Sequence, residues 1–145
     1  MSEEFIDVFF LDDEKDIIDT LIDYEFNGFK LHFYQDPGKC LEDLSKIRPW
    51  IIVSDQRMPN MNGNEFLKQA KEILPLSIKI MLTGFTDEAV PADLINNGCA
   101  DGFFKKPLDP SAFEKLLIKY RDIYVTENIV KRYKAVFGSS QNEEG

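Results

Sequence analysis

Residues 51–59 read IIVSDQRMP. The first three residues are apolar and β-branched, and the run ends at a single carboxylate, Asp55, which is followed by a turn containing Pro59. A short apolar run bounded by a turn predicts a buried strand. Ligands of open α/β sheets bind at the carboxyl ends of the strands, so Asp55 is a candidate functional group.

Four other short apolar runs predict further strands, at residues 5–11, 29–34, 78–83 and 101–105. Apolar residues at helical spacing predict helices over residues 14–26, 37–47, 63–74 and 110–120, and another that begins near Asp87 or Pro91 and ends before Gly98. The strands recur every 20–27 residues or so, which is typical of successive βα units in a parallel sheet. We expect an α/β fold with one doubly wound, five-stranded parallel sheet and helices on both faces.

The composition limits the possible functions. The chain has 145 residues, suited to one domain, and its net charge of −9 argues against a nucleic-acid-binding surface. Its two cysteines, Cys40 and Cys99, match neither a zinc spacing nor a disulfide framework. The acidic N-terminus is unlike a signal peptide, and no apolar run is long enough to span a membrane. We therefore expect a cytoplasmic protein that makes no contact with membranes.

Polar residues from four strand ends should meet at the carboxyl rim of this sheet. They are Asp12, Asp13, Asp55, Thr83 and Lys106. Three carboxylates in one place repel each other unless a cation lies among them, and an all-oxygen ligand set suits Mg²⁺. A lysine and a hydroxyl are suited to phosphoryl oxygens. The residues themselves predict a metal-assisted phosphoryl site.

In this arrangement the sequence resembles the receiver domain of two-component response regulators over residues 5 to about 124. The matching pieces are Asp12-Asp13, Asp55 with Met58-Pro59 and Gly63, Thr83, and Lys106-Pro107. The resemblance implies a flavodoxin-like (βα)5 fold with strand order 2-1-3-4-5. It places the receiver domain in residues 1–124.

The resemblance also implies a signalling domain and not an enzyme with a separate substrate. Asp55 would accept a phosphoryl group from a phosphohistidine on a sensor histidine kinase or phosphotransfer protein. Asp13, Asp55 and the backbone carbonyl of Arg57 would hold Mg²⁺, and Asp12 would act through a metal-bound water. Self-phosphorylation and self-dephosphorylation at Asp55 would be its only chemistry.

A conformational switch follows from the same resemblance. Lys106 would pair with the phosphoryl oxygens, and the Lys106-Pro107 peptide would be cis. Thr83 would turn inward, and Phe103 would move from exposed to buried. These shifts would remodel the face formed by the fourth helix, fifth strand and fifth helix, and so control an output domain or a downstream protein.

Two residues that depart from common receiver patterns bear on the lifetime of the phosphorylated state. By the family's geometry, Arg57 and Phe85 flank the path of the hydrolytic water. Neither carries a carboxylate or amide that orients water, and both are bulky. We expect slow self-dephosphorylation, although a structural ion pair of Arg57 with Glu14 or Glu88 remains an alternative role.

Two other functions fit parts of the pattern. A pseudo-receiver is a pure interaction module, but such modules usually lose one of Asp55, Thr83 or Lys106, all of which are present. A phosphohydrolase of the haloacid-dehalogenase type also uses Mg²⁺ and an aspartate nucleophile. That family requires Asp-x-Asp directly after its first strand, and Leu11-Asp12-Asp13-Glu14 lacks this spacing.

Residues 125–145 extend beyond the normal end of a receiver. Apolar residues at helical spacing, Ile129, Val130, Tyr133, Val136 and Phe137, predict a helical extension that packs on a second copy, giving a homodimer, or on an output domain. The polar residues 139–145 predict a disordered tail. The single histidine, His32, lies within a predicted strand away from the rim, so we assign it a structural role.

Overall fold

The computed structural model describes residues 5–84 and 100–144. Its strands are β1 (Ile6–Leu11), β2 (Phe29–Tyr34), β3 (Ile51–Asp55), β4 (Ile78–Thr83) and β5 (Gly102–Lys105), and its helices are α1 (Lys15–Ile22), α2 (Pro37–Ile47), α3 (Gly63–Ile73) and α5 (Pro110–Glu144). The helix predicted between the last two strands, and with it Phe85, lies outside the described residues.

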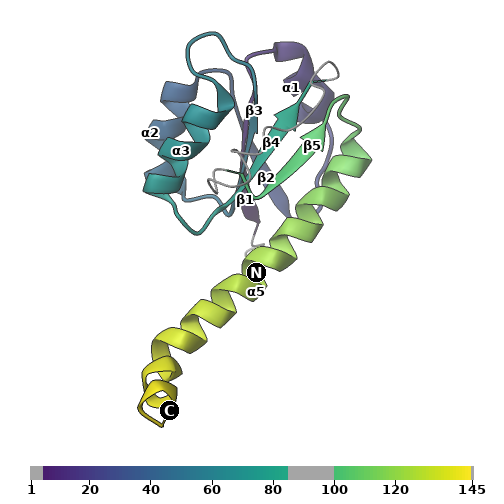
Figure 1. Cartoon of the computed structure of the whole chain (residues 1–145). Coiled ribbons are helices and arrows are strands. Elements are labelled where there is room, and N and C mark those ends of the chain that lie inside the picture. Colours follow the sequence, from purple (N-terminus) through teal and green to yellow (C-terminus); the bar gives the residue numbers. More distant parts are fainter. Residues whose placement is uncertain (1–4, 85–99, 145) are drawn as a thin grey trace.

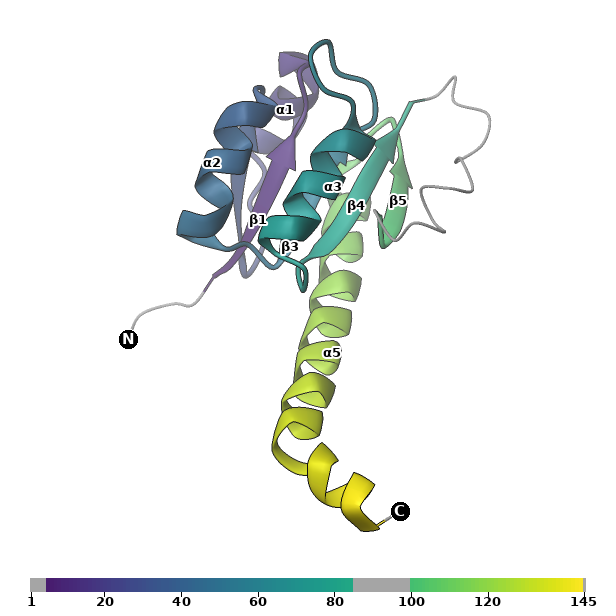
Figure 2. The same cartoon turned by 60° about the vertical axis from the view of Figure 1, so that its left-hand side comes forward.

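The five strands form one parallel sheet in the order β2-β1-β3-β4-β5, which confirms the predicted fold. Helices α2 and α3 cover one face of the sheet, and α1 and the first part of α5 cover the other (Figures 1 and 2). All strands are parallel, so their carboxyl ends share one edge, where the predicted site residues lie.

Alternation along β1 fills the core on both faces of the sheet. Val8 and Phe10 pack in the cluster on the α1 and α5 side, whereas Phe9 and Leu11 pack in the cluster on the α2 and α3 side. All four side chains are fully buried. Side chains of successive strand residues point to opposite faces, so a central strand covered on both sides is apolar throughout.

Side-chain caps fix where three helices begin. The Asp36 carboxylate accepts hydrogen bonds from the backbone N–H groups of Gly38 and Lys39 at the start of α2. The Asn62 side chain accepts one from Glu65 N–H at 2.8 Å before α3, and Asp109 caps α5 in the same way. These caps satisfy N–H groups that have no partner within the helix.

Helix α1 is shorter than predicted and ends at Ile22 instead of Phe26. Its last turn has no basic residue. Asp19 and Asp23 place negative charge near the negative end of the helix dipole, which is unfavourable. The apolar spacing that suggested a longer helix therefore continues past the point where the backbone leaves the helical path.

Helix α5 continues through Glu144, so the polar residues predicted as a disordered tail are helical up to that point. Adding residues to an existing helix is easier than starting one, and Ser, Gln and Glu tolerate helical backbone. Trp50 stacks on Tyr124 of α5 with ring centroids 4.5 Å apart. Figure 2 shows the later part of α5 extending away from the sheet. Despite its length, neither α5 nor another helix in residues 5–84 and 100–144 is apolar enough to cross a membrane.

Candidate functional site

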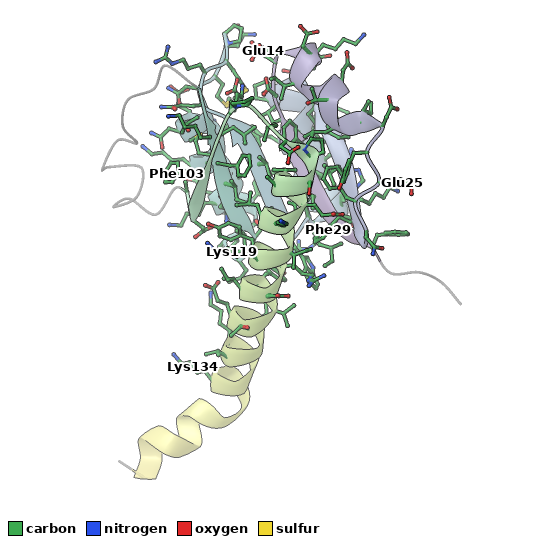
Figure 3. The ribbon with its side chains drawn as sticks, turned by 90° about the vertical axis from the view of Figure 1, so that its right-hand side faces the viewer. Glu14, Glu25, Phe29, Phe103, Lys119 and Lys134 are labelled. Atoms are coloured by element: carbon green, nitrogen blue, oxygen red, sulfur yellow. The ribbon has the colours of Figure 1, made fainter. Side chains whose placement is uncertain are left out.

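Four strand ends bring the predicted residues to one edge of the sheet. Asp12 and Asp13 follow β1, Asp55 ends β3, Thr83 ends β4, and Lys106 follows β5. Asp12, Asp55 and Thr83 are 0%, 4% and 7% exposed, respectively. Figure 3 shows Glu14 at this end of the molecule, far from the free end of α5.

Lys106 lies between the carboxylates. Its Nζ is 3.1 Å from Oδ2 of Asp12, 3.1 Å from Oδ1 of Asp55 and 3.9 Å from Oε1 of Glu14. The peptide bond between Lys106 and Pro107 is cis, as the resemblance implies. One largely buried cation therefore balances two buried carboxylates, and the cluster keeps an excess of negative charge.

Burial and this excess charge affect proton binding at the site. Burial, with repulsion from Asp12, raises the pKa of Asp55 to about 6, and attraction to Lys106 offsets only part of the increase. Burial also raises the pKa of Asp12. For Lys106, burial favours the neutral amine, but attraction to Asp12 and Asp55 outweighs it and raises the pKa. Another cation would relieve the repulsion among the carboxylates.

The carboxylates fit a Mg²⁺ ion. Oxygens of Asp12, Asp13, Glu14 and Asp55 lie within 4.8 Å of one another. Among residues 5–84 and 100–144, nothing donates a hydrogen bond to the buried Oδ1 of Asp13. A buried carboxylate oxygen without a donor is suited to a cation, and an all-oxygen set without His or Cys is what Mg²⁺ prefers.

Glu14 is a member of the cluster that the sequence did not predict. Its backbone N–H donates to Oδ1 of Asp12 at 2.9 Å, which folds the turn after β1 and keeps its carboxylate near Lys106. Its side chain is 63% exposed, so it lies at the outer edge of the site. The sequence signal was the third consecutive acid after β1, which was interpreted only as part of a turn.

The turn after Asp55 packs directly on the start of α3. The N–H of Gly63 donates to the carbonyl of Gln56 at 2.9 Å. A Cβ at Gly63 would collide with the carbonyl oxygen of Asp55 and lie 2.7 Å from the sulfur of Met81. Only glycine allows this close approach, which fixes the backbone on the carboxyl side of Asp55.

The sequence matches the response regulator receiver domain over residues 8–118. The chain belongs to the response regulator receiver family. The receiver is 33% identical to a protein-glutamate methylesterase/protein-glutamine glutaminase of Thermotoga maritima, over 74% of this chain and 32% of that protein. It is 28% identical to the transcriptional regulatory protein FixJ of Rhizobium meliloti, over 70% of this chain and 50% of that protein. This receiver thus spans about a third of the first relative and half of the second.

Solved structures share the same fold. The receiver superposes on a CheY-like response regulator receiver domain protein from Methanospirillum hungatei with a TM-score of 0.74 and 25% identity, covering 86% of this chain and 99% of that one. An uncharacterized protein from Neptuniibacter caesariensis gives a TM-score of 0.78 at 25% identity, covering 88% of this chain and 95% of that one.

The other residues predicted from the sequence lie at the strand end beside Lys106, on the core, on the surface and away from the site. The carbonyl of Thr83 accepts the Lys106 N–H at 2.9 Å, so these two strand ends are tied together. Phe103 is half-buried against the core cluster on the α2 and α3 side. Arg57 is exposed on the turn after β3. His32 bonds to Asp7 at 2.8 Å, and this pair joins β2 to β1 away from the site.

Mg²⁺ binding to the receiver should weaken in acid. Because the pKa of Asp55 is about 6, only about a tenth of this carboxyl is ionised near pH 5, whereas nearly all of it is ionised near pH 7.5. A protonated carboxyl is a poor ligand, so the Mg²⁺ dissociation constant should increase about tenfold between these values. Isothermal titration calorimetry measures it. Equal affinities at the two pH values would contradict this account of the site.

Proposed function

We propose that the receiver transmits a signal by accepting a phosphoryl group on Asp55 from a phosphohistidine of a sensor histidine kinase or phosphotransfer protein. The observation that carries the proposal is the position of Asp55, buried at a strand end with its Oδ1 3.1 Å from Lys106 and beside the unsatisfied Oδ1 of Asp13. A carboxylate that is paired with a cation and lies beside an oxygen available to bind a metal ion suits phosphoryl transfer.

In the proposed reaction, an oxygen of Asp55 attacks phosphorus and the bond from phosphorus to the histidine nitrogen breaks. The imidazole leaves with the electron pair and takes up a proton from solvent. Asp55 must be ionised to attack, and a pKa of about 6 allows this at neutral pH. Lys106 then moves from the carboxylates to the phosphoryl oxygens, a short shift because its Nζ already lies 3.1 Å from Asp55.

Asp13, Asp55 and the backbone carbonyl of Arg57 would hold Mg²⁺, with Asp12 acting through a bound water. The ion would neutralise charge on the phosphoryl oxygens. Asp12 also keeps Lys106 in place through its 3.1 Å ion pair, so it orients the amine before transfer. The close packing of Gly63 against the backbone of Asp55 and Gln56 supports the turn that carries Arg57.

Phosphorylation would change the face that includes β5 and α5. Thr83 would turn toward the phosphoryl group, and Phe103 would bury its ring further. Thr83 and Lys105 are paired in the sheet, so a shift at the end of β4 reaches β5 directly. Phe103 lacks a hydroxyl, and therefore its contribution is steric packing against the core. The readers of this face would be an output domain or a downstream cytoplasmic protein.

Arg57 would also affect the lifetime of the aspartyl phosphate. It is exposed on the turn that follows the acceptor, and a long side chain there would crowd the line that a hydrolytic water takes. Phe85, the other residue assigned to this role, lies outside the described residues. We propose slow self-dephosphorylation as the resting behaviour of this receiver.

Incubation with acetyl phosphate tests the function. The receiver should incorporate acid-labile phosphate with Mg²⁺ and not with a chelator, because the carboxylate cluster requires the cation. Steady release of phosphate from p-nitrophenyl phosphate would instead support a phosphohydrolase. Failure to incorporate phosphate, together with failure to bind Mg²⁺, would support a pseudo-receiver.

A further inference from the structure

A groove of about 520 Å³ lies at the opposite end of the sheet from Asp55, where α1 ends and β2 begins. Eight of its eleven lining residues carry apolar or aromatic side chains, among them Phe5, Ile22, Tyr24, Phe29, Leu31 and Phe33. Ile22 and Phe5 are 53% and 48% exposed, which is high for large apolar side chains. Neighbouring exposed apolar residues of this kind mark an interaction surface.

The groove exists because α1 is short. Phe29, Leu31 and Phe33 alternate along β2 and face the side covered by α1 and α5, but only Phe29 is fully buried. Strand β2 is also an edge of the sheet. The early end of α1 at Ile22 leaves this apolar edge without the cover that another helical turn would give.

Several acidic side chains surround the groove, and the guanidinium of Arg121 lies over the ring of Phe29, 5.8 Å from its centroid. Glu25 lines it, and Asp19 and Asp23 are exposed beside Ile22 on α1. The carboxylate of Glu114 accepts hydrogen bonds from the backbone N–H of Asn27 and the hydroxyl of Tyr24, and so adds negative charge at the same end. Glu25 and Phe29 lie on one side of α5 in Figure 3.

The extension of α5 has the complementary properties. Val125 and Val130 are 38% and 45% exposed. Residues 128–142 contain three basic residues and no Asp or Glu, while the net charge of −9 lies entirely in residues 1–124. The apolar stripe between residues 129 and 137 covers only two to three turns, shorter than the three to four heptads typical of a coiled coil. Such a stripe needs an existing apolar surface to pack on.

We propose that residues 128–137 of one copy dock in this groove of a second copy, and that the exchange is reciprocal. A chain does not fill its own groove, because α5 runs straight away from the sheet and carries Lys134 far from Glu25 and Phe29 (Figures 1 and 3). A reciprocal exchange closes with two-fold symmetry. The basic residues of this segment then lie near the acidic side chains around the groove. This contact is independent of phosphorylation at Asp55.

Sedimentation analysis of the full 145-residue chain tests the proposal. A dimer is expected, and Ile22→Ser should increase its dissociation constant about tenfold, since an apolar side chain loses its cover. The control Ile73→Ser removes a 40% exposed apolar side chain from α3, outside the groove, and should leave the constant unchanged. Circular dichroism melting verifies that each variant is folded.

Charge exchange identifies the pair of surfaces. Glu25→Lys alone, and Lys131→Glu with Lys134→Glu, should each weaken the dimer, and combining all three should restore it. A chain that stays monomeric at every concentration would overturn the proposal. A dimer whose dissociation constant is unchanged by both Ile22→Ser and Glu25→Lys would also overturn it. Such a dimer would be formed by another surface, such as paired α5 helices.

Discussion

Asp55→Asn is expected to lower phosphate incorporation from acetyl phosphate at least a hundredfold, to the background level. An amide oxygen is a poor nucleophile. Among residues 5–84 and 100–144, only Asp55 and Asp12 are carboxylates that are buried at a strand end and paired with Lys106. Of these two, only Asp55 adjoins the turn that packs on Gly63. Asp16→Asn is the matched control. It alters an exposed acid in the first turn of α1, outside the cluster, and should leave labelling unchanged.

Loss of labelling in Asp55→Asn would not reflect unfolding. The pKa of Asp55 in the folded chain, about 6, is above its ordinary value, so this group stabilises the fold fully in acid and loses that contribution as the pH rises through 6. Replacing it with a neutral amide should therefore keep or raise the melting temperature at neutral pH. A variant that melts well below the wild type would contradict this electrostatic account.

Lys106→Met is expected to lower the free energy of unfolding by about 2–3 kcal/mol at neutral pH without Mg²⁺. The change leaves Asp12 and Asp55 buried without the amine that lies 3.1 Å from each. The loss should shrink near pH 5, where Asp55, with a pKa of about 6, is largely protonated, and also on adding Mg²⁺. Urea denaturation under the three conditions measures it.

The control for this variant is Lys68→Met, which removes an exposed lysine of α3 and should change stability by less than about 0.5 kcal/mol. A Lys106→Met loss that is the same at both pH values and unaffected by Mg²⁺ would contradict the proposed repulsion between the carboxylates. It would point to lost packing of the lysine stem instead.

The sheet and its rim were predictable because their signals are local. Each strand is a short apolar run that ends at a polar residue, and parallel strands place those residues on one edge. These signals predict that Asp12, Asp13, Asp55 and Lys106 lie together, and the structure confirms that they meet. The strand order came from the resemblance, since several orders satisfy the same spacing.

Features that depend on distant contacts were not predictable. Lys79 lies within β4 and is only 2% exposed, although a lysine inside a strand normally indicates a solvent-facing position. Its Nζ donates to the carbonyls of Leu74 and Ser77 at 2.7 and 2.8 Å, and burial lowers its pKa to about 8. These acceptors belong to the loop before β4, whose path no sequence pattern reveals.

The early end of α1 was missed for a similar reason. Its apolar spacing continues to Phe26, and that residue is indeed buried in the core, but it reaches the core from the loop after α1 and not from the helix. Periodicity indicates which side chains are buried, but it does not show whether a helix or a loop carries them. The groove beside β2 follows from this difference.

Mapping the phosphoryl group along the chain identifies the acceptor residue. The chain is labelled with acetyl phosphate and Mg²⁺, reduced with borohydride, which converts an aspartyl phosphate to homoserine, and digested for mass spectrometry. We expect homoserine at position 55 and at no other aspartate. An unchanged Asp55, or reduction at Asp12 or Asp13 in its place, would contradict this expectation.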